Sequence, residues 1–311
     1  MRIAYLGTSD YAAVVLAHVA ASKHEVALAV TPPDSRRGRG RSLKPPPVAE
    51  EASRLGIPLW QAANVNEPET LDKLAELELD CLVVCAFGQM IRAALLDNYL
   101  ILNVHPSLLP RWRGAAPIER AIMAGDEKTG VGIMQLEAGL DSGPVALERE
   151  TPIEPDDNFG TLEARLANIG GELLVEALDQ LAEGKLEFTP QTEEGLTYAE
   201  KIDPSERRLD PARTARELEL VVRGLNPHVG TYLELEGGDR LGVKHAKAVD
   251  VENPPAQGEL AADSGRLILG CAEGTLAIPE VQPPGKKPMD AAAYLNGRGN
   301  QPPALAAADT E

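Results

Sequence analysis

An asparagine and a histidine, both able to donate hydrogen bonds to an oxygen, lie two residues apart at Asn103 and His105. Side chains two positions apart on a strand share one face, and Pro106 should end the strand there. The pair is therefore expected at the carboxyl end of a strand, where open α/β sheets bind ligands. An amide and an imidazole there could stabilise an oxygen that gains negative charge in a transition state. On spacing alone, the alternative that both side chains only satisfy backbone groups stays open.

A second candidate, Asp141, lies in the loop of residues 139–144. Glycine-flanked acidic loops are usually plain turns. In the functional interpretation, Asp141 approaches His105, fixes the tautomer of its ring and raises its basicity. Covalent catalysis is not indicated, because Ser107 lacks the Gly-x-Ser-x-Gly elbow of serine hydrolases. The nucleophile is therefore expected to come from the substrate.

The segments that would position these residues alternate between strands and helices. Residues 2–6 predict a strand, a helix follows the turn at Gly7, and the apolar run 80–86 predicts a strand buried on both faces. Together with the strand at 100–105, this alternation predicts a doubly wound α/β sheet. Gly7 lacks the Gly-x-Gly-x-x-Gly spacing and no P-loop pattern is present, which argues against the two commonest cofactor classes of such sheets.

The length of the chain predicts two domains. A chain of 311 residues is more typical of two domains than of one. We expect the α/β domain to span residues 1–187, and a linker without clear periodicity to span 188–206. Residues 207–300 contain short β-like runs separated by Gly, Pro, Asn and Asp, which predicts a small antiparallel barrel or sandwich. Residues 301–311 are expected to form a disordered tail.

The charge is strongly negative overall but positive in one segment. A net charge of −18 argues against generic affinity for nucleic acid. Residues 31–47, rich in Pro and Gly, predict a loop, into which five basic residues crowd: Arg36, Arg37, Arg39, Arg41 and Lys44. Such a loop could bind RNA at one place, or it could be solvated without a partner. The acidic excess stays open between adaptation to a salty cytoplasm and drift in surface composition.

Nothing in the sequence predicts a membrane segment or a metal site. No stretch reaches the ~20 apolar residues of a membrane span, and the N-terminus reads as a strand rather than as a signal peptide. Cys81 and Cys85 lie in an apolar run and are interpreted as buried small hydrophobes, and Cys271 stands apart from them. These features favour a cytoplasmic protein in a reducing compartment, with no membrane partner and no metal.

Four stretches of sequence resemble a known family. Residues 103–110 read Asn-Val-His-Pro-Ser-Leu-Leu-Pro and resemble the signature of the folate-dependent formyltransferases, although many members carry Gly in place of Pro106. Residues 111–118, 197–202 and 283–289 resemble further elements of one branch, the methionyl-tRNA formyltransferases. The likeness runs from residue 1 to about residue 300.

This resemblance implies a Rossmann-like formyltransferase domain followed by a small OB-fold-like β-barrel domain that binds tRNA. It implies 10-formyltetrahydrofolate as the formyl donor and the amino group of initiator methionyl-tRNA as the acceptor. The product would be N-formylmethionyl-tRNA for translation initiation. The reaction requires no metal, and a monomer is expected.

The resemblance also assigns roles to residues. Asn103, His105 and Asp141 match the catalytic trio of the family. Four residues match its folate-binding segment: Ser107, Leu108, Leu109 and Pro110. Backbone groups near residues 87–90 are expected to help hold the pterin. The basic loop with Arg36, Arg37, Arg39, Arg41 and Lys44 matches the tRNA-binding insertion of the family.

Three other functions are alternatives to this one. A glycinamide ribonucleotide formyltransferase would share the chemistry, but it would not need ~100 extra C-terminal residues. A formyltransferase acting on an amino sugar nucleotide would share the trio and could carry a C-terminal barrel, but the basic loop and the run Gly285-Lys286-Lys287 argue against it. A non-catalytic RNA-binding protein with a degenerate enzyme domain would not need the intact trio.

Overall fold

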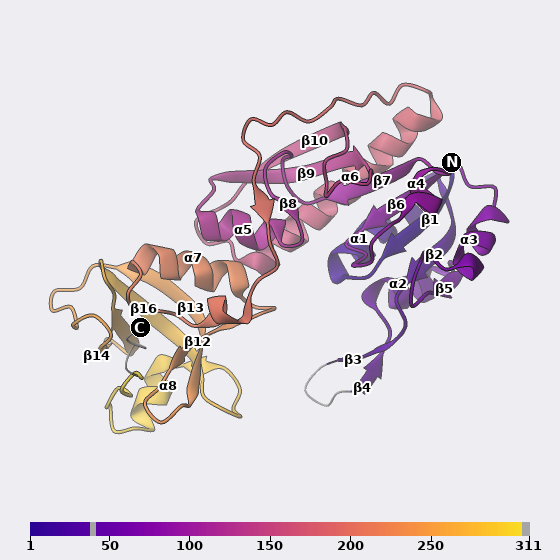
Figure 1. Cartoon of the computed structure of the whole chain (residues 1–311). Helices are drawn as coiled ribbons and strands as arrows, with labels where there is room; N and C mark the ends of the chain where they lie inside the picture. The colour runs from indigo at the N-terminus through magenta and orange to yellow at the C-terminus, as the bar shows by residue number, and fades with distance from the viewer. Residues whose placement is uncertain (38–41, 307–311) are drawn as a thin grey trace. The chain divides into compact units, whose positions relative to one another are not determined.

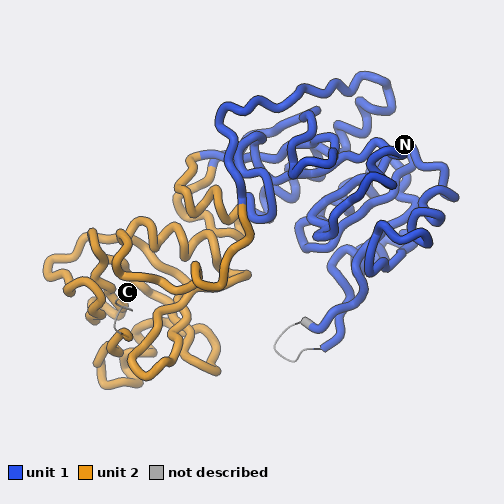
Figure 2. Tube along the Cα trace, viewed as in Figure 1, with its two compact units in different colours: residues 1–117, 128–152, 163–199 blue, residues 118–127, 153–162, 200–311 orange. Residues whose placement is uncertain are grey.

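The computed structural model describes residues 1–37 and 42–306, so Arg39 and Arg41 of the basic loop lie outside the described residues. The chain divides into two compact units (Figure 2). Unit 1 comprises residues 1–117, 128–152 and 163–199, and unit 2 comprises residues 118–127, 153–162 and 200–311. Each unit has a sheet of its own.

Unit 1 is built on a seven-stranded sheet in the order β10-β9-β7-β6-β1-β2-β5 (Figure 1). Its strands are β1 (Arg2–Gly7), β2 (Glu25–Thr31), β5 (Leu59–Gln61), β6 (Cys81–Cys85), β7 (Ile101–His105), β9 (Lys128–Gln135) and β10 (Val145–Pro152). The five neighbouring strands β5, β2, β1, β6 and β7 run parallel to one another. The strands β9 and β10 are antiparallel to their neighbours. All five residues of β6 are buried, as its apolar run predicts. The Rossmann-like α/β fold is confirmed.

The helices of unit 1 are α1 (Asp10–Ala20), α2 (Pro47–Leu55), α3 (Pro68–Ala75), α4 (Ala93–Leu96) and most of α6 (Phe159–Ala182). On α6, Leu166, Leu174 and Leu178 repeat at multiples of four residues and are fully buried, which is the pattern of an amphipathic helix. Gly170 occupies the same face, where a Cβ atom would lie 3.0 Å from Val104 Cγ1. The missing side chain therefore lets α6 approach the strand that carries Asn103 and His105.

Two short strand pairs in unit 1 differ from the sequence expectation. Residues 31–47 are expected to form a loop, but β3 (Ser35–Arg37) and β4 (Ser42–Lys44) pair antiparallel there. The segment after residue 187 is expected to be a linker, but β11 (Tyr198–Ala199) pairs parallel with β8 (Arg113–Gly114). Residues 163–199 all belong to unit 1, so this unit extends past the expected boundary at residue 187.

Unit 2 contains an antiparallel sheet, as predicted. Its strands are β12 (Thr231–Glu234), β13 (Arg240–Val249), β14 (Leu260–Asp263), β15 (Arg266–Gly270), β16 (Thr275–Gln282) and β17 (Met289–Asp290). Helix α7 (Ala215–Leu225) begins at a capping box formed by Thr214 and Glu217. It packs on the sheet through a hydrophobic core that includes Leu218, Val222 and Leu225. Two shorter helical segments, η1 (Pro204–Arg207) and α8 (Ala291–Asn296), complete the C-terminal part.

Two earlier segments of the chain also belong to unit 2. Residues 118–127 contain most of α5 (Pro117–Ala124), and Met123 from this helix packs against the core around α7. Residues 153–162 are fastened by Arg223, whose guanidinium donates to the carbonyls of Asp157 and Glu154 at 2.6 and 2.8 Å. The C-terminal unit is therefore not one continuous stretch, as the boundaries expected from the sequence would have it.

The first part of the expected tail is paired with the sheet. Leu305 forms an antiparallel bridge with Leu235, and the N–H of Ala306 donates to the carbonyl of Glu234. Residues 305 and 306, at the start of the tail that the sequence predicts to be disordered, are thus bonded to the backbone of residues 234 and 235. In the described ranges of the chain, no helix is both long and apolar enough to cross a membrane.

Candidate functional site

The carboxyl end of β7 carries the two residues that the sequence singles out. Asn103 and His105 are both buried, with 7% and 4% of their surfaces exposed. The loop between β9 and β10 brings Asp141 to them. Asn103 Nδ2 lies 3.5 Å from Asp141 Oδ1, and His105 Nδ1 lies 3.7 Å from Asp141 Oδ2. The fold thus gathers the three predicted residues from positions 38 and 36 residues apart in the chain.

The ring of His105 has a second polar neighbour. Its Nε2 atom lies 2.9 Å from the backbone oxygen of Trp112. A carbonyl can only accept a hydrogen bond, so Nε2 carries the proton in the neutral ring and Nδ1 presents its lone pair toward Asp141. The backbone of Trp112 therefore helps to orient the His105 ring, on the side opposite to the Asp141 carboxylate that the sequence singles out.

The predicted folate-binding residues do not all face outward. Ser107 is fully buried, and its hydroxyl donates to the carbonyl of Arg111 at 2.7 Å, so it fastens the loop from inside. Leu109 is also buried. Leu108 and Pro110 are partly exposed. Leu108 packs over Gly130 of β9, where a Cβ atom would approach its Cδ2 atom to 2.5 Å.

The loop after β6 is held in place near the same sheet edge. Thr8 Oγ1 donates to the carbonyl of Phe87 at 2.6 Å, and the side chain of Gln89 bonds to the backbone of Ala62 and Val65. Met90 follows with 77% of its surface exposed. The loop therefore presents an apolar side chain on a fixed backbone.

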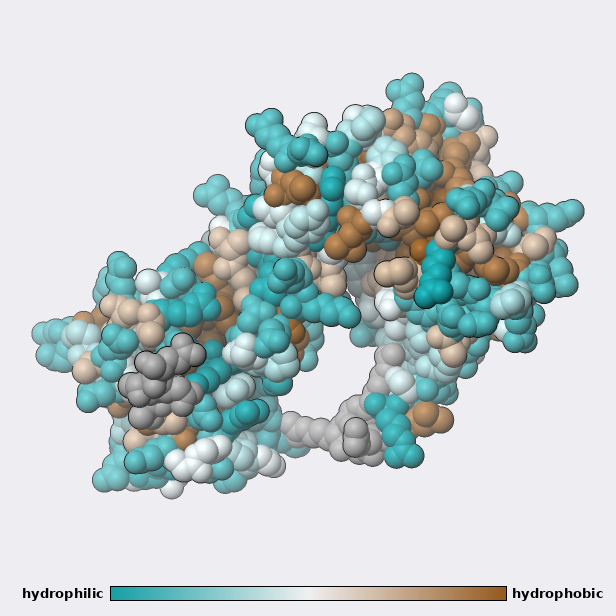
Figure 3. All heavy atoms as spheres, viewed as in Figure 1, coloured by the Kyte–Doolittle hydropathy of each residue, from teal (hydrophilic) through white to brown (hydrophobic). Residues whose placement is uncertain are grey.

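Among the described residues, the large apolar side chains with more than a third of their surface exposed all lie in unit 1. Leu140, beside Asp141, is 61% exposed. Figure 3 shows that patches of apolar residues interrupt the hydrophilic surface of unit 1 on the visible face.

Two polar residues that fasten the loops around the trio were not predicted from the sequence. Gln191 contacts Arg113 and the backbone of the loop that carries Asp141. Thr197 Oγ1 accepts a hydrogen bond from the N–H of Trp112 at 2.9 Å. Gln191 and Thr197 belong to the segment interpreted as a linker. The resemblance of residues 197–202 to a family element was the one signal that pointed to this segment.

The two described ends of the basic segment, Ser35–Arg37 and Ser42–Lys44, pair as β3 and β4. Arg36 and Lys44 are exposed, and Leu43 beside them is 67% exposed. Within the described part of the chain, no group of three or more His, Cys, Asp or Glu residues is placed to hold a metal ion.

Two family models match the chain. The model described as "Formyl transferase" matches residues 1–178, and the model described as "Formyl transferase, C-terminal domain" matches residues 201–299. Among solved structures, HypX from Aquifex aeolicus in complex with tetrahydrofolic acid aligns with a TM-score of 0.65 at 19% identity, covering 95% of this chain and 47% of that chain. An N-formyltransferase from Helicobacter canadensis, in complex with folinic acid and dTDP-3-aminofucose, aligns with a TM-score of 0.65 at 13% identity, covering 89% and 98%. At these identities the structural likeness concerns the fold alone.

Curated relatives are much more similar in sequence. The methionyl-tRNA formyltransferase of Parvibaculum lavamentivorans is 41% identical over 305 residues, which cover 97% of this chain and 98% of that protein. The methionyl-tRNA formyltransferase of Chromohalobacter salexigens is 45% identical over 312 residues, which cover 97% and 95%. With this identity over nearly the whole length of both chains, the protein belongs to the formyltransferase family and, within it, to the methionyl-tRNA formyltransferases.

Proposed function

We propose that this chain transfers a formyl group from 10-formyltetrahydrofolate to the amino group of initiator methionyl-tRNA. The observation that carries the proposal is the convergence of Asn103, His105 and Asp141 at the end of β7 in a chain with such relatives. The product, N-formylmethionyl-tRNA, serves translation initiation. We place the enzyme in the cytoplasm, as a monomer.

The trio is proposed to act on both the formyl oxygen and the amine proton. The free amine of the methionyl ester attacks the formyl carbon, and the bond from that carbon to the folate nitrogen breaks. Asn103 Nδ2 has two hydrogens, and one of them can stabilise the developing oxyanion, a contribution typically worth ~3–4 kcal/mol. The Asp141 carboxylate, beside His105 Nδ1, takes up the amine proton. The proton is then delivered to the folate nitrogen as that nitrogen leaves. Such acid–base assistance typically contributes ~10²–10⁴-fold.

The folate is proposed to bind along the loops at this sheet edge. Leu108 and Pro110 are the partly exposed members of the segment, and Met90 and Leu140 offer exposed apolar surface for a flat pterin ring. Ser107 and Leu109, being buried, would shape the segment rather than touch the ligand.

The tRNA is proposed to contact two parts of the chain. The basic residues of the β3–β4 segment, with Arg39 and Arg41 between its strands, would bind phosphates of the acceptor arm. The antiparallel sheet of unit 2 supports an OB-fold-like tRNA-binding domain, with Lys286 and Lys287 as further cationic groups.

One assay tests the function. The protein is incubated with 10-formyltetrahydrofolate and either methionyl-tRNA or an amino sugar nucleotide, and the formylated amine is measured. We expect product with methionyl-tRNA only. Asn103→Ala and His105→Ala are the matched inactive controls, with kcat lowered by about 10²-fold or more. Formylation of the sugar nucleotide in place of methionyl-tRNA would reassign the enzyme to the alternative class.

A further inference from the structure

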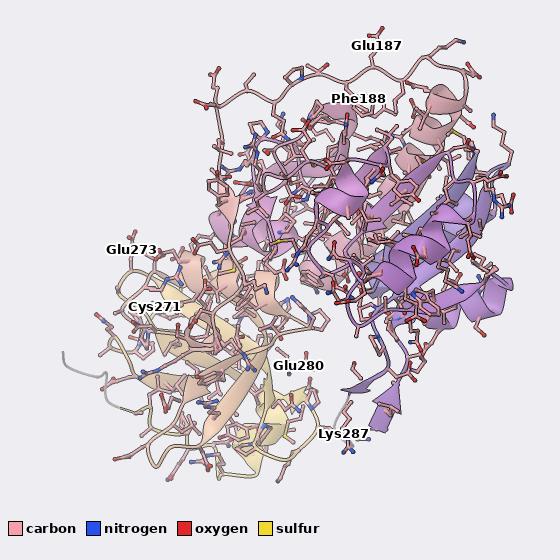
Figure 4. The ribbon with its side chains drawn as sticks, turned by 45° about the vertical axis from the view of Figure 1, so that its right-hand side comes forward. Glu187, Phe188, Cys271, Glu273, Glu280 and Lys287 are labelled. Carbon is pink, nitrogen blue, oxygen red and sulfur yellow. The ribbon has the colours of Figure 1, made fainter. Side chains whose placement is uncertain are left out.

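The segment between α6 and unit 2 contains a glutamine whose amide is fully used. This segment leaves α6 in extended form past Glu187 and Phe188 (Figure 4), and Thr189 pairs with Val145 of β10. Gln191 Nε2 donates to the carbonyls of Asp141 and Gly143 at 2.8 and 2.7 Å. Its Oε1 atom accepts from Nε and Nη2 of Arg113 at 2.9 and 2.7 Å.

The orientation of this amide follows from its partners. Two carbonyls can only accept hydrogen bonds and a guanidinium can only donate them, so a reversed amide would face four mismatched contacts. Both amide hydrogens and both lone pairs of Gln191 therefore have partners. The amide joins the loop that carries Asp141 to the strand that carries Arg113.

The loop whose carbonyls Gln191 contacts has an unusual backbone conformation at two residues. Asp141 adopts a φ of 45°, in the left-handed region that residues with a Cβ rarely occupy. A Cβ atom on Gly143 would lie 2.0 Å from the carbonyl oxygen of Gln135. A backbone of this kind persists only when its surroundings hold it, and the two carbonyls that Gln191 contacts lie at these two residues.

The same region also holds the carboxylate itself. Asp141 Oδ2 accepts the N–H of Gly114 at 2.8 Å. Gly114 follows Arg113 in β8. The guanidinium that donates to Gln191 and the backbone N–H that donates to Asp141 therefore come from adjacent residues. Gln191 therefore fixes the backbone of Asp141 relative to the strand that holds its side chain.

We propose that Gln191 is a positioning residue for the transfer reaction. It acts through Asp141, because the distances from that carboxylate to Asn103 and His105, 3.5 and 3.7 Å, depend on where the loop lies. A misplacement of about 1 Å in a catalytic arrangement can cost ~10²-fold in rate. The competing interpretation is that Gln191 only fastens the segment to unit 1. The inference rests on the proposed function for the choice of acceptor.

Two substitutions at Gln191 test the role of its amide. Gln191→Met removes all four hydrogen bonds at similar side-chain length. Gln191→Glu keeps an acceptor for Arg113 but turns a carboxylate oxygen toward two carbonyls. Thr192→Glu is the matched control, because it places the same charge one residue further along on an exposed side chain. We expect kcat to fall about 10- to 100-fold in both Gln191 variants, with the KM for methionyl-tRNA and the activity of Thr192→Glu nearly unchanged.

A double-mutant cycle decides whether the effect passes through Asp141. If it does, Gln191→Met should cost little further activity in a protein that already carries Asp141→Asn, because coupled residues are not additive. Fully additive losses, an unchanged kcat in Gln191→Met, or an equal loss in Thr192→Glu would each overturn the proposal.

A measurement without substrate keeps this test separate from the proposed function. The Gly114 amide should exchange its hydrogen faster in Gln191→Met, because the carboxylate that accepts it is no longer held, whereas the amides of β6 should keep their protection. An unchanged exchange rate at Gly114 would contradict the positioning role of Gln191, whichever amine the enzyme formylates. If the unaltered protein formylates another amine instead of methionyl-tRNA, the proposed function fails, and the same kinetic cycle is run with that amine.

Discussion

Asp141 is the residue at which the polar contacts of the site meet. Its carboxylate faces Asn103, His105 and the N–H of Gly114. Asp141→Asn preserves the shape but removes the charge that would take up the amine proton. We expect kcat for formyl transfer to fall by about 10²–10⁴-fold, with folate affinity retained. Steady-state kinetics and folate binding followed by fluorescence measure the two quantities. Loss of folate binding would instead assign Asp141 to holding the ligand.

The buried side chain of His24 makes the stability of the protein depend on pH. Its side chain has no exposed surface, Nδ1 faces the amino group of Met1, and Nε2 lies 3.0 Å from Asp179 Oδ1. Burial, followed by the positive charge of the Met1 amino group, lowers the pKa of His24 below 6.5. The unfolded chain therefore binds a proton more readily, and stability is lost as the pH falls below about 6.5 toward the folded pKa.

The melting temperature measured from pH 8 to pH 5 tests this stability effect. We expect it to decrease toward pH 5 more steeply in the unaltered protein than in His24→Gln. His18→Gln is the control, because it changes another histidine that bonds a polar neighbour, Asn168. If His24→Gln keeps the full pH dependence, the titrating group lies elsewhere.

The convergence of Asn103, His105 and Asp141 could be predicted from the sequence better than the groups that support them. The two-residue spacing of Asn103 and His105 places them on one strand face, and this held because β7 is a regular strand ending at His105. The partner of His105 Nε2 is the backbone oxygen of Trp112, a residue with a φ of 64°. A backbone group has no side-chain signature, so sequence patterns cannot indicate it. The hydrogen bonds of Gln191 are equally long-range and have no local periodicity.

At the scale of elements, the basic residues of the β3–β4 segment are expected to bind tRNA. Changing Arg37, Arg39 and Arg41 together to Ala should weaken tRNA binding, because cationic side chains that bind phosphate release counterions. The log–log slope of affinity against salt should flatten by roughly 0.7–0.9 for each arginine–phosphate interaction that the substitutions remove. Folate affinity and melting temperature should stay nearly unchanged. A triple variant with the affinity and slope of the unaltered protein would leave the acceptor arm to other groups, such as Lys286 and Lys287.

Strands with a local apolar run were predicted well, and short strands with distant partners poorly. The buried strand β6 has an apolar run that specifies it locally. The two-residue strands β8 and β11 pair across more than 80 positions, so neither shows a pattern within itself. From the sequence, residues 188–206 are therefore expected to form a linker, although residues 188–199 belong to unit 1. Strand pairs that depend on distant partners are recognised only once the fold is known.

At the scale of the whole molecule, two internal segments depend on the C-terminal part of the chain. His228 Nε2 lies 2.9 Å from Glu119 Oε1, and its ring stacks on Phe159 at a centroid distance of 3.5 Å. Arg223 adds two bonds to the backbone of residues 153–162. A fragment of residues 1–199 keeps residues 118–127 and 153–162 but loses all these partners.

Hydrogen exchange on this fragment tests that dependence. We expect both segments to exchange at least about tenfold faster than in the full chain, because a decrease of about 1.4 kcal/mol in local stability is a factor of ten. The strands β1, β6 and β7 should keep their protection, which is the internal control. Unchanged protection of residues 118–127 and 153–162 would show that unit 1 alone is enough to order them.

The interleaved order of the two units limits how such genes can recombine. The chain passes from one unit to the other five times, after residues 117, 127, 152, 162 and 199. A single genetic crossover near residue 199 would join residues 200–311 of one parent to residues 118–127 and 153–162 of another. The chimera would then inherit a mosaic C-terminal core, in which Met123 and Arg223 descend from different ancestors. Viable hybrids between distant parents should therefore carry compensating exchanges in those two inner segments.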